Sequence, residues 1–205
     1  MAGRFSKQVL AQAAALTFAA MVCAQSVTAE TVSPGKATVQ KVVNLFSVWR
    51  GDESSSPFFK EVAKVIDYDE MSEKALGVHW DKLSPTERNE FSSTFRRLIE
   101  ERYYKRWHRI FNSAELAYKS EVPTDGDLYI KTLMTVGNKQ DNVVWRLSSR
   151  SGSYKIINIA VNQKDLLQRL SDRLDQRMRK DSFKGVLTWM REETSGDDDD
   201  TNHRT

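Results

Sequence analysis

The hydrophobic pattern of this chain changes its period near residue 115, and this change restricts the possible folds more than any other feature. Before that point, apolar residues recur every three or four positions, as in amphipathic helices. After it, short apolar runs alternate with turn-forming residues, as in strands. The expected helices begin near residues 34, 57, 70 and 85, the expected strands cover 116–118, 128–136, 143–147 and 154–161, and two later helices cover 166–178 and 183–190.

The order of these elements predicts the fold class. Short connections between successive strands imply an antiparallel meander. Helices followed by such a sheet give a two-layer α+β arrangement. We therefore expect a single domain with helices packed on a curved antiparallel sheet of about four strands. Helices laid across the concave face of such a sheet can enclose a cone-shaped cavity.

The first residues have the pattern of a cleavable secretory signal. Arg4 and Lys7 give a positively charged start, residues 9–22 are apolar at all but two positions, and small residues precede a cleavage site after Ala29. Cleavage after Ala24 is the alternative. The apolar run is too short and too rich in alanine for a membrane-spanning helix. We therefore expect export to the periplasm.

Removal of the signal also removes Cys23, the only cysteine of the chain. The mature protein then has no thiol, which excludes disulfides, thiolate catalysis and cysteine-based metal sites. Val22 stands where a lipoprotein signal has a small residue, which argues against lipidation of Cys23. The chain thus divides into a signal peptide over residues 1–29, a folded domain over 30–193 and a disordered acidic tail over 194–205.

Basic side chains are concentrated in the body of the chain. Residues 30–191 contain 28 basic and 22 acidic side chains. A basic body fits contact with anionic lipid head groups or with an acidic partner, and a solvated charged surface is the simpler interpretation. The basic run at 96–109 also contains aromatic residues, as in proteins that bind nucleic acids. An exported protein rarely meets nucleic acid, so we expect none as a partner.

Residues suited to catalysis are sparse. The three histidines, His79, His108 and His203, have no metal-ligand spacing, and no glycine-rich phosphate loop follows a strand. The carboxylates around Asp67 stand at a helix start, where capping and the helix dipole favour them. We expect neither enzymatic activity nor a metal.

The most specific pattern lies between residues 65 and 107. It consists of Asp-Tyr-Asp-Glu-Met at 67–71, Ala-Leu-Gly-Val-His-Trp at 75–80, Leu-Ser-Pro-Thr-Glu-Arg at 83–88 and a helix with Phe91, Phe95, Leu98 and Tyr103. This combination resembles the MlaC family of toluene-tolerance periplasmic proteins, and the order of elements agrees from about residue 36 to residue 190. Asn158 stands where the family has Asp, and Asn162-Gln163-Lys164 replaces its Gly-Val-Ser turn. Lys184-Gly185 replaces an Asp-Gly.

The resemblance implies an NTF2-like cone with a deep apolar pocket, bound phospholipid as cargo and no cofactor. It also implies a periplasmic shuttle, auxiliary to an ABC transporter. Such a shuttle exchanges lipid between an outer-membrane lipoprotein complex and an inner-membrane transporter that bears a substrate-binding ring.

Strand alternation and the apolar stripe of the long helix suggest walls for this pocket. The same side chains could fill a solid core, which would favour an interaction module, and the pocket could carry another lipid such as a hopanoid. The candidate lipid-binding residues are Leu128, Ile130, Met134, Val143, Trp145, Leu147, Ile157 and Ile159 on the strands, Phe95, Leu98, Ile99 and Tyr103 on the long helix, and Trp49, Phe58, Phe59 and Ile66 at the mouth or lid. The candidates for the head group are Arg97, Lys105 and Lys155.

Overall fold

The computed structural model describes residues 32–51 and 57–195, and the predicted signal peptide lies outside these ranges. The helices of the described ranges are α1 (Pro34–Val48), α2 (Pro57–Val62), α3 (Tyr68–Leu76), α4 (Pro85–Phe111), α5 (Leu166–Lys180) and α6 (Phe183–Ser195), together with the short 3-10 helix η1 (Gly77–Lys82). Helix α6 extends two residues into the predicted tail, and the rest of that tail lies outside the described residues.

Capping residues set where the helices begin. The hydroxyl of Ser33 accepts a hydrogen bond from the backbone N–H of Lys36 at the start of α1. Asp67 caps α3 in the same way. Ser84 and Glu87 form a reciprocal capping box at the start of α4, the longest helix of the described ranges. These local signals explain why the helix positions could be predicted.

The strands form one antiparallel sheet in the order β1-β2-β3-β4-β5. The predicted α+β fold, with helices packed on a curved antiparallel sheet, is confirmed, but the sheet has five strands instead of about four. The additional strand has only two residues and pairs with the end of β4. A strand this short leaves no periodic signal in a sequence. The strands are β1 (Glu115–Thr124), β2 (Asp127–Val136), β3 (Lys139–Ser148), β4 (Lys155–Val161) and β5 (Lys164–Asp165).

Tight two-residue turns connect β1 to β2, β2 to β3 and β4 to β5. Asp125 and Gly126 between β1 and β2 both have positive φ, and so do Asn162 and Gln163 between β4 and β5. Type I′ hairpin turns require this conformation. The side chain of Asn162 also accepts a hydrogen bond from the backbone N–H of Asn142 on β3, over 2.9 Å. The turn therefore holds β5, and the start of α5 behind it, beside the end of β4.

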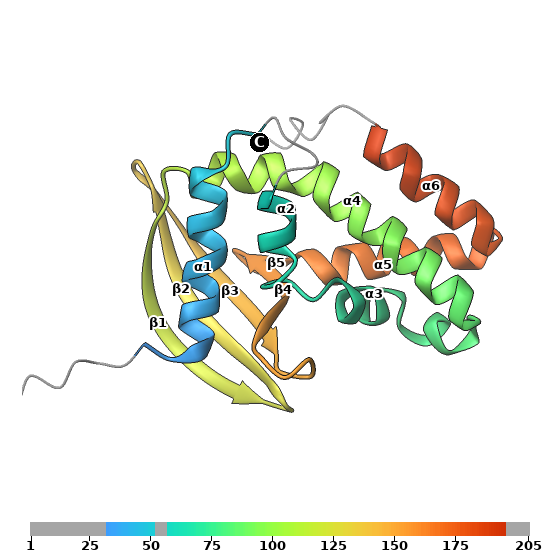
Figure 1. Cartoon of the computed structure of the whole chain (residues 1–205), viewed down its shortest axis with the longest axis horizontal. Coiled ribbons are helices and arrows are strands. Elements are labelled where there is room, and N and C mark those ends of the chain that lie inside the picture. Colours follow the sequence, from blue (N-terminus) through green and yellow to red (C-terminus); the bar gives the residue numbers. More distant parts are fainter. Residues whose placement is uncertain (1–31, 52–56, 196–205) are drawn as a thin grey trace, which may run out of the picture. The chain divides into compact units, whose positions relative to one another are not determined.

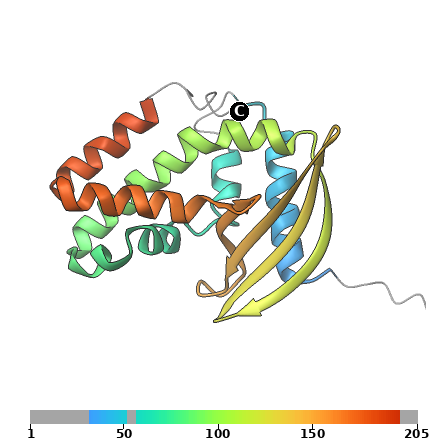
Figure 2. The same ribbon diagram turned by 180° about the vertical axis from the view of Figure 1, so that it is seen from behind.

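Helix α1 lies along the curved sheet, and α4 runs from the side of α6 toward the sheet (Figure 1). The view from behind shows the sheet in front of α1 (Figure 2). A Cβ on Gly35, at the start of α1, would lie 2.4 Å from the side chain of Leu128 on β2. Helix and sheet are therefore in close contact at this end.

The chain between α2 and α3 joins the helices to the sheet. Ile156, near the start of β4, donates its backbone N–H to the carbonyl of Val65 (2.8 Å). Its own carbonyl accepts a hydrogen bond from the N–H of Asp67 (3.0 Å). Ile66 thereby forms a parallel bridge with Ile156.

Aromatic side chains fill the space between α1, α2 and α4. The ring of Phe46 packs edge-on against Tyr104, Trp107 and Phe58. Trp49 stacks on Phe58 with ring centroids 4.7 Å apart. This part of the interior is a packed core, since ring meets ring on several sides.

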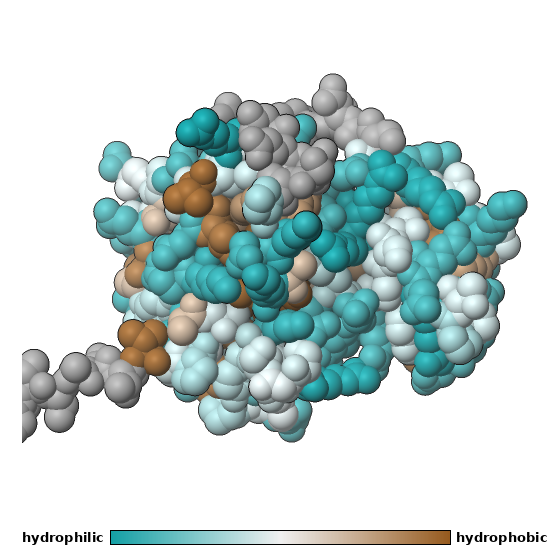
Figure 3. Space-filling view, in the orientation of Figure 1, coloured by the Kyte–Doolittle hydropathy of each residue, from teal (hydrophilic) through white to brown (hydrophobic). Residues whose placement is uncertain are grey.

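The surface seen in the orientation of Figure 1 is mostly hydrophilic, with small separate hydrophobic areas (Figure 3). Val32 and Val48, near the two ends of α1, are 67% and 76% exposed. Scattered exposed residues of this kind are usual on globular proteins.

Candidate functional site

A hollow of about 590 Å³ opens between the second half of α4 and one end of the sheet. This volume is in the range of small-molecule binding sites, roughly 300–1,000 Å³. The hollow lies where β2 ends, β3 begins and β4 passes into β5 and α5. Its apolar walls are formed by Tyr103, Trp107, Ile110, Phe111, Met134, Val136, Val143, Ile159, Val161 and Leu166.

The helical spacing of apolar residues on α4 and their alternation on the strands explain how these walls form. Tyr103, Trp107 and Ile110 are separated by three or four positions, so they share one face of α4. On the sheet, Val143 of β3 lies directly opposite Val161 of β4 in the register. Side chains that share one face of neighbouring strands form a continuous apolar surface. The hollow is thus the space between one helix face and one sheet face.

Polar and packing contacts hold α4 in place above the sheet. His108 Nδ1 lies 2.7 Å from the carbonyl oxygen of Phe46, which ties α4 to α1. Trp107 packs edge-on against Phe46, and Trp107 also lines the hollow. The aromatic core between α1 and α4 therefore keeps this half of α4 in position.

The mouth of the hollow is basic. Among the described lining residues, Asp141 is the one carboxylate, and it accepts a hydrogen bond from the side-chain amide of Asn162 (2.5 Å). The site therefore combines an apolar interior with a cationic rim. The basic lining residues are Arg106 and Arg109 on α4, Lys139 on β3, Lys164 on β5 and Arg169 on α5.

Comparison with known proteins identifies the family. The family model described as MlaC protein matches residues 51–192. The chain belongs to the MlaC family. Among solved structures, its fold is similar to that of a phospholipid-binding protein from Ralstonia solanacearum in complex with a phospholipid. That match has a TM-score of 0.66 and 15% sequence identity, and it covers 80% of this chain and 96% of the other. A search of curated proteins finds no match.

Four of the lipid-binding residues predicted from the MlaC resemblance and the strand pattern line the hollow. They are Tyr103, Met134, Val143 and Ile159. The other predicted strand residues are buried in the core of the domain. The predicted helix residues Phe95, Leu98 and Ile99 are also buried, on the earlier part of α4. The predicted strand and long-helix residues that do not line the hollow are Leu128, Ile130, Trp145, Leu147, Ile157, Phe95, Leu98 and Ile99.

The residues predicted for the mouth lie elsewhere. Trp49, Phe58 and Phe59 belong to the aromatic core, where Trp49 and Phe58 stack. Ile66 forms the bridge to Ile156. The sequence pattern shows that these residues are apolar and periodic, which suits a packed core as well as a lid.

The structure brings none of the three predicted head-group residues to the hollow. Arg97 forms an exposed ion pair with Glu101 (2.6 Å) one turn along α4. Lys105 is exposed on α4 and is not among the lining residues. Lys155 begins β4 opposite Ser148, whereas the hollow lies at the end of β4. The basic residues that line the hollow instead follow hairpin turns or lie on α4 and α5. The sequence alone does not identify them, because their positions depend on how the strands pair.

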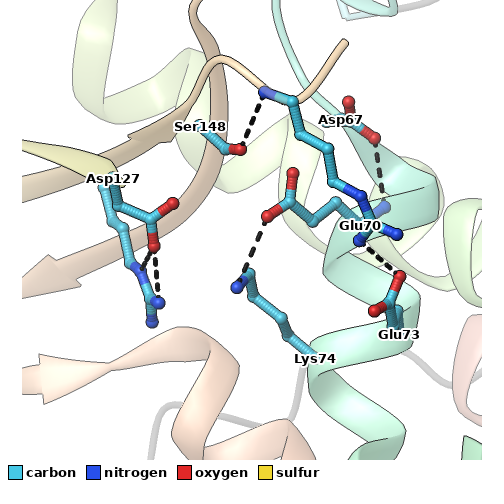
Figure 4. Close-up of polar contacts among 8 residues, drawn as sticks. Asp67, Glu70, Glu73, Lys74, Asp127 and Ser148 are labelled. Carbon is cyan, nitrogen blue, oxygen red and sulfur yellow. Dashed lines mark hydrogen bonds and ion pairs between the residues drawn. The ribbon is translucent and has the colours of Figure 1, made fainter. Parts of the chain in front are cut away.

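Charged side chains at the other end of the sheet join α3 to the β3–β4 connection and β2 to β3 (Figure 4). Glu70, only 6% exposed, pairs with Lys74 at 3.4 Å. Glu73 pairs with Arg150 at 2.6 Å. Asp127 of β2 pairs with Arg146 on the neighbouring strand β3. Each of these carboxylates has a basic partner, so the cluster stabilises the fold.

Tyr68 and Tyr104 are two buried titratable groups of the core. The hydroxyls of Tyr68 and Tyr104 share a hydrogen bond. Burial raises the pKa of both phenols, so both stay neutral at ordinary pH. Within the described ranges, no three or more His, Cys, Asp or Glu side chains are grouped to hold a metal ion. In the same ranges, no helix combines the length and hydrophobicity needed to cross a bilayer.

Proposed function

We propose that this protein is a periplasmic phospholipid-binding shuttle. It serves as an auxiliary component of an ABC-type lipid transport system between the outer and inner membranes. The observation that carries the proposal is the apolar hollow of about 590 Å³ between α4 and the sheet, with its basic mouth. Membership of the MlaC family and the likeness to a protein solved with a phospholipid support the same function.

The two parts of the site match the two parts of a phospholipid. Apolar side chains such as Val143, Ile159 and Ile110 would cover acyl chains, and the basic rim would face the phosphate. Transfer of each CH₂ out of water is worth about 0.8 kcal/mol. A donor membrane hides the same chains, so the net free energy of transfer is small and exchange is reversible. This function needs no chemical step.

The proposed partners are an outer-membrane lipoprotein complex, which gives or takes the lipid, and the substrate-binding ring of an inner-membrane ABC transporter. A carrier that meets both must hold its cargo between contacts and release it on contact. An apolar pocket that is open to the surface allows this, since a chain can leave without unfolding the domain.

The test is to express the full chain, purify the protein from the periplasm and analyse the extracted lipid. We expect native mass spectrometry to show protein with bound phospholipid, and extraction to identify its head group. Recovery of a polycyclic lipid such as a hopanoid would keep the carrier function and change the cargo. Folded protein that contains no lipid and takes up none from vesicles would contradict the proposal and favour an interaction module.

A further inference from the structure

The rim of the hollow is lined by more basic than acidic side chains. Basic side chains come to it from α4, β3, β5 and α5, and Asp141 is the one carboxylate among the described lining residues. The side chain of Asp141 is already engaged by Asn162. Basic side chains therefore outnumber acidic ones among the described residues that line this mouth.

Three of these cations are placed by rigid parts of the fold. Lys139 is the first residue of β3 and pairs with Val136 across the β2–β3 turn. Lys164 pairs with Val161 across the turn that precedes β5. Arg169 lies in the first turn of α5, directly after this hairpin. Because two tight turns and a capped helix fix their backbones, the three charges converge on one opening.

Several arginines elsewhere in the described ranges have a carboxylate partner, unlike these three cations. Within the described ranges, Lys139, Lys164 and Arg169 form no ion pair. By contrast, Arg146 pairs with Asp127 and Arg173 pairs with Glu193 at less than 3 Å. Three unpaired like charges around one opening repel one another, and a bound anion removes that repulsion. The apolar wall of the same hollow favours an anion that belongs to an amphipathic molecule.

We propose that Lys139, Lys164 and Arg169 bind the phosphate of the lipid head group and select lipids of net negative charge over zwitterionic ones. This inference rests on the proposed lipid-binding function. Charge-assisted hydrogen bonds from Lys and Arg to phosphate are stronger than neutral ones. A phosphoglycerol head group adds only hydroxyls beyond its phosphate. A phosphoethanolamine head group brings an ammonium that meets like charges at this rim.

The experiment measures binding in solution, away from any membrane surface. Short-chain phosphatidylglycerol and phosphatidylethanolamine with identical acyl chains compete with a fluorescent lipid bound to the protein. We expect the unaltered protein to bind phosphatidylglycerol about tenfold more tightly, roughly the effect of one charge-assisted contact. The preference falls as salt is added, because the three cations are exposed and screened.

The decisive variant is Lys139→Gln, Lys164→Gln and Arg169→Gln combined. It is expected to lose the preference for phosphatidylglycerol, because its affinity for phosphatidylglycerol falls more than its affinity for phosphatidylethanolamine. The matched control, Lys82→Gln, Lys119→Gln and Lys131→Gln combined, removes three exposed charges that do not line the hollow and is expected to keep the preference. Circular dichroism confirms that both variants are folded.

The outcomes separate this inference from the proposed function. Equal binding of both lipids by the unaltered protein, or a preference that survives the triple variant, overturns the head-group assignment and leaves lipid binding intact. Failure of both lipids to bind overturns the lipid-binding function as well. Inorganic phosphate alone should compete weakly because it has no acyl chains. If it displaced the probe as well as phosphatidylglycerol does, the rim would be a site for free phosphate.

Discussion

Phe111 of α4 stacks on Trp145 of β3, with ring centroids 5.7 Å apart and ring planes inclined by 29°. Trp145 is fully buried, and its indole N–H donates to the hydroxyl of Thr132 over 3.0 Å. Phe111 also lines the hollow. The same ring therefore belongs both to the packed core and to the wall of the hollow.

Replacement of Phe111 by alanine tests whether its ring is part of the packed core. Phe111→Ala is expected to lower the free energy of unfolding by about 3–5 kcal/mol, because a large buried side chain is removed from beside Trp145. Urea unfolding followed by tryptophan fluorescence measures the change. The control is Ile110→Ala, at a half-buried neighbour that also lines the hollow, where a smaller loss is expected. Equal losses in the two variants would show that the Phe111 contact is not part of the core.

A bulky side chain in the hollow should block lipid without unfolding the protein. Val161 is half-buried on β4 and lines the hollow. We expect Val161→Trp to abolish most lipid uptake from vesicles, at a cost to stability of at most about 1–3 kcal/mol. Val122→Trp is the control, since Val122 is exposed on β1 away from the hollow. Undiminished uptake in Val161→Trp would place the lipid elsewhere.

The contact between His79 of η1 and Asp175 of α5 predicts a dependence on pH. The hydrogen bond from His79, followed by the contact with Arg179, lowers the pKa of the Asp175 carboxyl. A carboxyl whose pKa is lower in the folded state stabilises the fold above its unfolded value, about 3.9. This contribution is lost as pH falls through the folded value.

We therefore expect His79→Ala to raise the pKa of Asp175 toward its ordinary value in an NMR titration. The variant should be less stable than the unaltered protein near neutral pH, and the difference should vanish in acid. Arg179→Ala removes the second contact that lowers this pKa and is also expected to raise it. An unchanged titration of Asp175 in His79→Ala would refute this account of the contact.

The predicted signal peptide has a direct test outside the described residues. N-terminal sequencing of the purified mature protein is expected to begin at Glu30, as cleavage after Ala29 requires. Ala29→Arg should block this cleavage, because the peptidase needs a small residue there. Ala24→Arg is the control and should leave it unchanged. A mature chain that begins at Gln25 would favour the alternative site.

The fold could be predicted because the signals that specify it are local. The capping box of Ser84 and Glu87 starts α4 where the sequence indicated, and Asp125-Gly126 forms the expected hairpin turn. The two-residue β5 could not be predicted, since its position depends on the turn at Asn162 and on pairing with β4. Capping and turn residues thus predict the longer helices and strands, whereas a short strand such as β5 depends on its pairing with a neighbouring strand.

The candidate site could be predicted only in part, because a hollow is a property of two layers together. Strand alternation shows that Ile130 and Met134 share a face, but Ile130 lies in the packed core and Met134 at the hollow. The same holds along α4, where Phe95 is core and Tyr103 lines the hollow. The sequence pattern predicts which side chains share the inner face of a strand or helix. It does not show at which of these positions the helix layer and the sheet separate to leave a hollow.

Asn158 occupies the position where the sequence comparison expects Asp, and the structure explains how the amide is used. Its Nδ2 donates to a carboxylate oxygen of Asp165 (2.7 Å), and its Oδ1 accepts the backbone N–H of Leu167 (3.0 Å). Asp165 in turn caps α5 by accepting the N–H of Gln168. The amide therefore joins β4 to the start of α5.

Asn158→Asp replaces the donor with a second carboxylate facing Asp165. We expect the variant to lose about 1–3 kcal/mol of stability near neutral pH, because a buried hydrogen bond becomes a repulsion between like charges. The loss should shrink in mild acid, where one proton on the carboxyl pair restores a donor. Urea unfolding at both pH values measures it, with Asn158→Ala as the control whose loss should not depend on pH. A loss in Asn158→Asp that is the same at both pH values would mean that the two side chains are not in contact.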